Sequence, residues 1–548
     1  MAHTDSISSS DNPNTLYSMR ILFGVIVVHT NNIVVDSVSR NFRKHPIILV
    51  FSIGCMVRSI PDMVAYPYPI GYDVINYYIP VITNFQEHWS YVSEQFPLYI
   101  LTLYLFQIGT NLQPQTLVSM SGIILYGLFS ISLFLMSRRL LGLHEVHSLY
   151  LTLFVIFQLP VLRTAWDLHK DVLSLTLLLI SVSLIYPLGA KIRQYSIIGS
   201  SIVASFAVSV DKMVGALFVA SLMIYGVVVR TKHITLLSLL IAGLFVAIIT
   251  SEYGSVQHSL QILSESAALN QLDLQQELYS PKNLLILLIV VNGPLLVPAG
   301  FGFMRSDNRL LRIAIVIAAI GSFSWLIFPD RQSLAADRWI FLFGIFLSIF
   351  AGYGIVKYSQ TRVHPGCRTC MLSVILGLSV ALGLIYEIMP YQFESFPGIM
   401  LGWSIEPFGP ATMQFNSIPV KDTNELIKTI YWINKNTPND AMVFGEKHWR
   451  GWMDIELQGD RLFKYGSNQY DTLQSMQDCH LNYCYIVTHL SESLRYMTKK
   501  VKTEQVYQNK LFAVYEIGSF YDMGGGLSSI IIHPNQKTRT NTSLSILK

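Results

Sequence analysis

The stretch Tyr66–Ile82, "YPYPIGYDVINYYIPVI", lies between two apolar runs and holds one carboxylate, Asp73, among five tyrosines and three prolines. No lysine or arginine occurs between Val64 and Pro97 to neutralise it. Ionisable groups at a bilayer are costly and mark function by default. If the flanking runs are membrane spans, the stretch predicts a functional carboxylate at the membrane surface.

The composition supports that setting. The 548 residues are 51% hydrophobic and only 13% charged, with a mean hydropathy of +0.43. Soluble domains carry roughly twice that proportion of charge, so an ordinary soluble protein is excluded. The formal net charge of +4 is small and gives no indication of a nucleic-acid partner.

The apolar runs predict an α-helical polytopic membrane protein with about 11 spans, since about 20 apolar residues cross a bilayer. The Pro97–Gly109 run is short and is better placed along the outer membrane surface. The predicted spans are 46–64, 115–137, 147–162, 172–188, 195–210, 213–229, 234–250, 283–300, 312–328, 338–356 and 371–389.

The distribution of basic residues orients these spans. With this layout 15 lysines and arginines fall in the loops on one side and 6 on the other, and the basic side is cytoplasmic. The N-terminal segment 1–45 is then cytosolic. The transmembrane domain is 46–389, with outer loops 65–114 and 163–171, and residues 390–548 are extracytoplasmic. We expect a multi-pass protein of the cell membrane.

Residues 390–548 read as a mixed α/β domain. The segment "TNELIKTIYWINKN" has helical spacing and "TPND" is a turn. The segments "AMVFG", "YCYIVTH" and "LFAVYEI" are typical of strands.

The five cysteines do not form a disulfide scaffold. Cys479 and Cys484 could pair if their domain faces an oxidising compartment. Cys367 and Cys370, with His364, offer three of the four ligands of a structural zinc site, but two thiols at a helix entrance are the more ordinary interpretation.

Polar residues gather in three predicted outer segments. The first holds Asp73, Asn76, Glu87, His88 and Glu94. The second is "RTAWDLHKD", 163–171, where Asp167 and Asp171 would share a helical face if its end opens the next helix. Locally paired, solvated charges are the alternative interpretation of this segment.

The third segment, "FPDRQSLAADRW", places Arg331 and Arg338 seven residues apart. A guanidinium can clamp a phosphate through two hydrogen bonds, which suits a lipid-phosphate ligand. Arginines that anchor the helix at the membrane surface are the alternative.

The early acid after "PIGYD" in a long first outer loop, the "PLY" segment and the inner "SRRLLG" resemble GT-C membrane glycosyltransferases. The resemblance is closest to protein O-mannosyltransferases and aminoarabinose transferases of archaeal and bacterial type. The outer segment "WINKNTPNDAMVFGEKHWRGW" and the ending "LFAVYEI" are similar as well. The likeness spans nearly the whole chain.

The resemblance implies an inverting transfer of a sugar from a dolichyl or polyprenyl phosphate donor to an extracytoplasmic hydroxyl of a protein or glycolipid. It implies Asp73 as general base, with Asp167 and Asp171 as further catalytic candidates. The donor phosphate would meet Arg163, Lys170, Arg331 and Arg338, and the substrate would contact Tyr72, Asn76 and His169. The family often has a second acid beside the first, but positions 72 and 74 are Tyr and Val, which leaves a requirement for Mg or Mn open.

Two other functions are consistent with a polytopic chain. A transporter or flippase of lipid-linked glycans would bind the same ligands without chemistry, and Arg58 inside the first span favours it. A sensor with an external ligand-binding domain would leave the loop carboxylates unexplained. The polar clusters on one face favour the enzyme.

Overall fold

The computed structural model describes ten stretches of the chain: 45–86, 98–185, 194–229, 241–244, 281–327, 336–388, 420–446, 449–466, 483–490 and 501–520. The chain divides into two units, Met1–Leu49 and Val50–Lys548. Every packing contact given below lies within the second unit.

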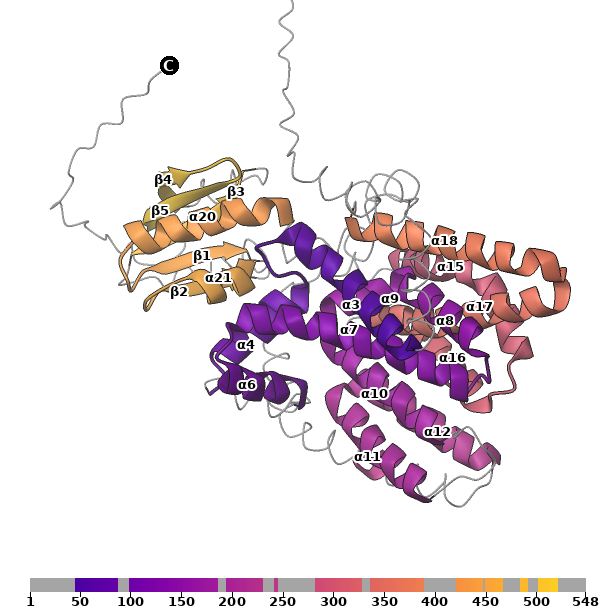
Figure 1. Ribbon diagram of the computed structural model, residues 1–548. Helices are drawn as coiled ribbons and strands as arrows, with labels where there is room; N and C mark the ends of the chain where they lie inside the picture. The colour runs from indigo at the N-terminus through magenta and orange to yellow at the C-terminus, as the bar shows by residue number, and fades with distance from the viewer. Residues whose placement is uncertain are drawn as a thin grey trace, which may run out of the picture. The chain divides into compact units, whose positions relative to one another are not determined.

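Long apolar helices dominate the described part of 46–388 (Figure 1). They are α3 (Pro46–Ala65), α7 (Pro114–Arg139), α8 (Glu145–Ile156), α9 (Leu159–Asp167), α10 (His169–Ile185), α11 (Gln194–Val210), α12 (Lys212–Val229), α15 (Pro281–Arg305), α16 (Arg309–Ser322), α17 (Ala336–Arg362) and α18 (Pro365–Ile388). Shorter elements are η1 (Val74–Tyr78), α4 (Ile79–Thr83), α6 (Leu98–Thr110) and η2 (Ser324–Leu326).

Six helices of the described residues are long and apolar enough to cross a membrane, or seven if α8 and α9 form one bent span. Ten of the eleven predicted spans overlap one of the helices given above, and the eleventh, 234–250, is described only at 241–244, which are helical. A multi-pass α-helical membrane protein is therefore supported, and the count of eleven stays a prediction. The 13-residue helix α6 exposes Leu105, Phe106 and Ile108, as a helix lying on a membrane surface would.

Helix α17 is the centre of the bundle. Of its apolar window 89% is buried, against 11% for α18, and it packs against α15, α16, α8 and α9. Close packing with α15 depends on two glycines. A Cβ on Gly302 would lie 2.0 Å from the Phe350 carbonyl oxygen, and one on Gly354 would lie 2.1 Å from that of Pro298. Small residues let membrane helices approach this closely.

The chain bends sharply between α8 and α9, a few residues before the polar segment 163–171. Helices α8 and α9 meet at 65°, and α9 ends at Asp167. The helical conformation is interrupted at Leu168, and α10 starts at His169. The expected outer loop is thus the end of one helix and the start of another, and Asp167 and Asp171 do not share one helical face.

The C-terminal α/β domain has the expected elements. Its five-stranded sheet has the order β2-β1-β3-β5-β4, with β1 parallel to β2 and β3, and β5 antiparallel to β3 and β4. The elements are α20 (Val420–Asn436), β1 (Met442–Glu446), α21 (Arg450–Glu456), β2 (Leu462–Gly466), β3 (Cys484–His489), β4 (Val501–Gln508) and β5 (Phe512–Phe520). The predicted helix, turn and three strands are confirmed in type.

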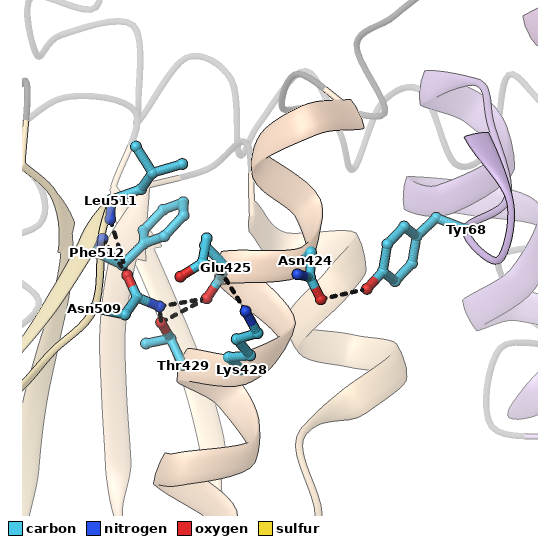
Figure 2. Close-up of polar contacts among 8 residues, drawn as sticks. All are labelled: Tyr68, Asn424, Glu425, Lys428, Thr429, Asn509, Leu511 and Phe512. Atoms are coloured by element: carbon cyan, nitrogen blue, oxygen red, sulfur yellow. Dashed lines mark hydrogen bonds and ion pairs between the residues drawn. The ribbon is translucent and has the colours of Figure 1, made fainter. Parts of the chain in front are cut away.

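Helix α20 lies across the sheet and is tied to it through Asn509 (Figures 1 and 2). The side-chain Nδ2 of Asn509 donates to the Glu425 carbonyl oxygen at 2.7 Å. The Asn509 Oδ1 accepts from the backbone N–H of Phe512 at 2.7 Å. Cys484 at the start of β3 is disulfide-bonded, and its predicted partner Cys479 lies outside the described residues.

Candidate functional site

Asp73 stands where the first outer segment meets helix α9. Its backbone N–H donates to Asp167 Oδ1 at 2.6 Å. Two residues earlier, Gly71 has a φ of +107°, and a Cβ there would lie 2.7 Å from the Trp166 carbonyl oxygen. Only glycine combines that backbone conformation with so close an approach. The "PIGYD" turn therefore presses Asp73 against the end of α9.

Each of the two carboxylates faces a guanidinium. Arg338 Nη2, from the first turn of α17, lies 3.2 Å from Asp73 Oδ2. Arg163 Nη2, one turn before Asp167 on α9, lies 3.1 Å from Asp167 Oδ2. The sequence placed no cation near Asp73, but α17 brings one from 265 residues away. Asp167 is a second acid beside Asp73 in the folded protein, although no acid adjoins Asp73 in the sequence.

The surroundings raise the pKa of Asp73 above that of an ordinary aspartate. Burial is the largest cause, since only 19% of the side chain is exposed, and the Asp167 carboxylate adds to it. Arg338, Lys170 and Arg163 act in the opposite direction. A carboxylate that is more basic than usual and still close to cations suits a general base.

A second pair of acids lies near this centre. The Asp171 and Asp211 carboxyl groups interact electrostatically with each other, and both act on Arg338. Asp211 caps α12 by accepting the amides of Met213 and Val214 at 2.9 and 2.8 Å. The sequence reasoning missed Asp211, although it follows an apolar run on the predicted outer side, as Asp171 precedes one.

The other predicted site residues divide into two groups. Lys170 lies near Asp73, with its Nζ 4.9 Å from the centre of the Tyr77 ring, and Tyr72 is 42% exposed. Asn76 and His169 make hydrogen bonds within the protein: Asn76 Oδ1 accepts from the Gly451 amide at 3.0 Å, and buried His169 contacts the Tyr99 hydroxyl through Nδ1 at 3.0 Å.

Arg331 lies outside the described residues. The tyrosines of the opening stretch have different surroundings, because Tyr66 is 83% exposed whereas Tyr78 is fully buried and stacks on the His169 ring.

The opposite side of α9 is held by buried ionisable groups. Arg58 Nε donates to the Ala165 carbonyl at 3.1 Å, and Arg58 Nη1 pairs with Asp62. Trp166 Nε1 lies 3.2 and 3.3 Å from the two oxygens of Glu387. Arg58 and Glu387 are both 1% exposed. Helix α9 is thus fixed by α3 and α18 while it presents Arg163 and Asp167 to Asp73.

The requirement for Mg or Mn stays a prediction. Within the ranges that the structure describes, no group of three or more His, Cys, Asp or Glu side chains could hold one. Asp73 and Asp167 each face a guanidinium group. His364, Cys367 and Cys370 are likewise not gathered, and both thiols are free and exposed.

Gly71→Ala is expected to lower activity about 10²-fold, because a shift of about 1 Å in a catalytic group costs that much. The new methyl group would meet the Trp166 carbonyl and push Asp73 away from Asp167. Gly142→Ala is the matched control, since Gly142 also has a positive φ, +61°, but has nothing within 4 Å of the added Cβ. Initial rates of the sugar transfer that the sequence resemblance implies, measured for both purified variants, test this, and equal rates would contradict it.

No family model matches the chain, and no curated protein matches it. Among solved structures, a similar one is the cryo-EM structure of the arabinofuranosyltransferase AftD from mycobacteria, with a TM-score of 0.46 and 8% identity. The match covers 86% of this chain and 40% of that one, so this chain spans less than half the length of AftD.

Proposed function

We propose that this protein is a membrane glycosyltransferase that moves a sugar from a lipid-phosphate donor to an extracytoplasmic hydroxyl. The observation that carries the proposal is the Asp73–Arg338 pair beside Asp167 and Arg163, at the ends of apolar helices. A base and fixed cations at a membrane boundary are what this reaction requires.

Asp73 acts as the general base in the proposed reaction. Its carboxylate takes the proton from the acceptor hydroxyl as the acceptor oxygen bonds to the anomeric carbon. The bond from that carbon to the donor phosphate oxygen breaks, and its electron pair leaves with the lipid phosphate. This single displacement inverts the anomeric centre. General-base assistance contributes typically 10²–10⁴-fold.

The cations near Asp73 have two roles in this proposal. Arg338, Arg163 and Lys170 neutralise the acids before the donor binds, and they stabilise the negative charge that grows on the leaving phosphate. Arg338 can exchange Asp73 for the donor phosphate, because its guanidinium has five hydrogen-bond donors and 34% of the side chain is exposed.

A flippase without chemistry remains the second candidate, and the buried Arg58 and Glu387 favour it. Arg58 and Glu387 are hydrogen-bonded to Asp62, Ala165 and Trp166, however. These bonds hold the helices together, as a structural contact would.

Purified protein, incubated with dolichyl- or polyprenyl-phosphate sugars and a glycan or peptide acceptor, should release lipid phosphate and form a glycosidic bond. Movement of the lipid-linked sugar across a vesicle membrane without a new glycosidic bond would replace the enzyme by the flippase. The proposed orientation, with 1–45 cytosolic and 390–548 external, places Asp73 on the outer side.

A further inference from the structure

The outer α/β domain is attached to the stretch that carries Asp73. The Gly451 amide of α21 donates to Asn76 Oδ1 at 3.0 Å, and a Cβ on Gly451 would lie only 2.5 Å from the Ile75 carbonyl oxygen. The Tyr68 hydroxyl donates to Asn424 Oδ1 of α20 at 3.0 Å (Figure 2). The buried Trp452 also contacts the Tyr68 ring edge-on, with centroids 5.9 Å apart. The start of α21 is therefore fixed beside η1.

Arg450, next to Gly451, is held in one orientation by its own domain. Its Nη1 donates to the Tyr465 hydroxyl at 2.8 Å, and its Nε donates to Asp454 Oδ2 at 3.3 Å. The guanidinium also lies over the Tyr465 ring, 5.4 Å from the centroid. Arg450 is still 47% exposed, and within the described residues no hydrogen bond engages its Nη2.

Tyr72 joins this pair to the catalytic centre. The pKa of Tyr72 is raised, chiefly by burial and then by the charges of Asp73 and Asp167, while Arg450 opposes the shift. The Asn76 side chain links the two segments, because its Nδ2 donates to the Tyr72 carbonyl oxygen at 3.0 Å while its Oδ1 accepts from the Gly451 amide, next to Arg450. Its side chain remains 42% exposed. A ligand that reaches Asp73 can therefore meet Tyr72 and Arg450 together.

We propose that Tyr72, Arg450 and Tyr465 form an acceptor subsite for an uncharged carbohydrate, which presents its hydroxyl to Asp73. The proposal rests on the function above and names the acceptor class for the same site. Tyrosine rings offer apolar faces with a polar tip, and the guanidinium offers donors of fixed direction. A sugar ring, with C–H faces and a rim of hydroxyls, matches that combination.

The local charges select against an acidic acceptor. Asp454 offsets the charge of Arg450, so this pair of described residues has no net positive charge to attract an anion. Asp73 and Asp167 lie close by, and juxtaposed like charges suppress wrong partners. An uncharged glycan can still accept hydrogen bonds from Arg450 without that repulsion.

The test measures binding in the absence of donor, so no turnover is needed. Full-length protein in nanodiscs is titrated with uncharged trisaccharides of mannose, glucose, galactose and arabinose, and with a threonine-containing peptide. At least one trisaccharide should bind. Arg450→Gln should weaken it about tenfold, which corresponds to the loss of one hydrogen bond to a charged group. Tyr465→Phe, which frees the guanidinium from its hydroxyl partner, should weaken it less.

Lys435→Gln is the matched control, because it removes an exposed cation of α20 outside the cluster and should leave the affinity unchanged. Binding of the peptide alone, or trisaccharide binding that Arg450→Gln does not weaken, would overturn the subsite. Glycan binding of the expected pattern with no sugar transfer from any lipid-phosphate donor would instead overturn the proposed function and leave the subsite standing.

Discussion

Replacing Asp73 with asparagine is expected to lower the turnover of sugar transfer by at least about 10²-fold, the low end for loss of a general base. The substitution keeps the size of the side chain and its ability to accept from Arg338, and the backbone N–H that binds Asp167 is unaffected. Folding should therefore survive. Asp460→Asn, at an exposed acid of the C-terminal domain, is the control and should retain full turnover.

The pH dependence of the rate provides an independent check on the same residue. Asp73 works only when ionised, so the rate should fall as pH falls through its pKa. Burial and Asp167 raise that pKa, so the acidic limb should lie above the ordinary aspartate value of about 3.9. Arg338→Gln removes a charge that lowers the pKa of Asp73 and should move the limb to higher pH. A limb that does not move, or an active asparagine variant, would rule Asp73 out, and Asp167 or Asp171 would become the next candidates.

Replacing Arg58 with methionine is expected to produce the largest loss of stability, about 3 kcal/mol or more. The change removes the donor to the Ala165 carbonyl and leaves Asp62 and Glu387 without the positive charge that acts on both. Removing one partner of a buried ionic group is costly because the remaining charge stays away from water. Unfolding temperatures in one detergent, measured by intrinsic fluorescence, test the prediction.

Two comparisons separate the ionic effect from a general effect of the substitution. Arg138→Met breaks a 3.8 Å pair with Glu145 whose side chains are 29% and 42% exposed, and should cost less than about 1 kcal/mol. Asp62→Asn and Glu387→Gln, added to Arg58→Met, remove the unpaired charges and should restore much of the loss. A triple variant no more stable than Arg58→Met would contradict the ionic explanation.

Composition and periodicity were sufficient for the class of the fold. A run of about 20 apolar residues has few alternatives to a membrane helix, because every backbone group must be bonded inside the segment. Short runs rich in apolar, aromatic and β-branched residues, such as "AMVFG" and "YCYIVTH", likewise predicted strands of the C-terminal domain, which the structure confirms as β1 and β3. These signals are local, so they survive without knowledge of the neighbours.

The sequence by itself therefore determined a polytopic helical chain with a C-terminal α/β domain, and it singled out Asp73 by its isolation. Only the tertiary structure decided which groups surround that acid. Arg338 pairs with it from a distant helix, Asp167 accepts its amide, and Gly451 of the C-terminal domain donates to Asn76, three residues further along the same segment. Helix packing brings these groups together. That packing depends on the interruption at Leu168 and on glycine contacts, and neither leaves a periodic signal in the sequence.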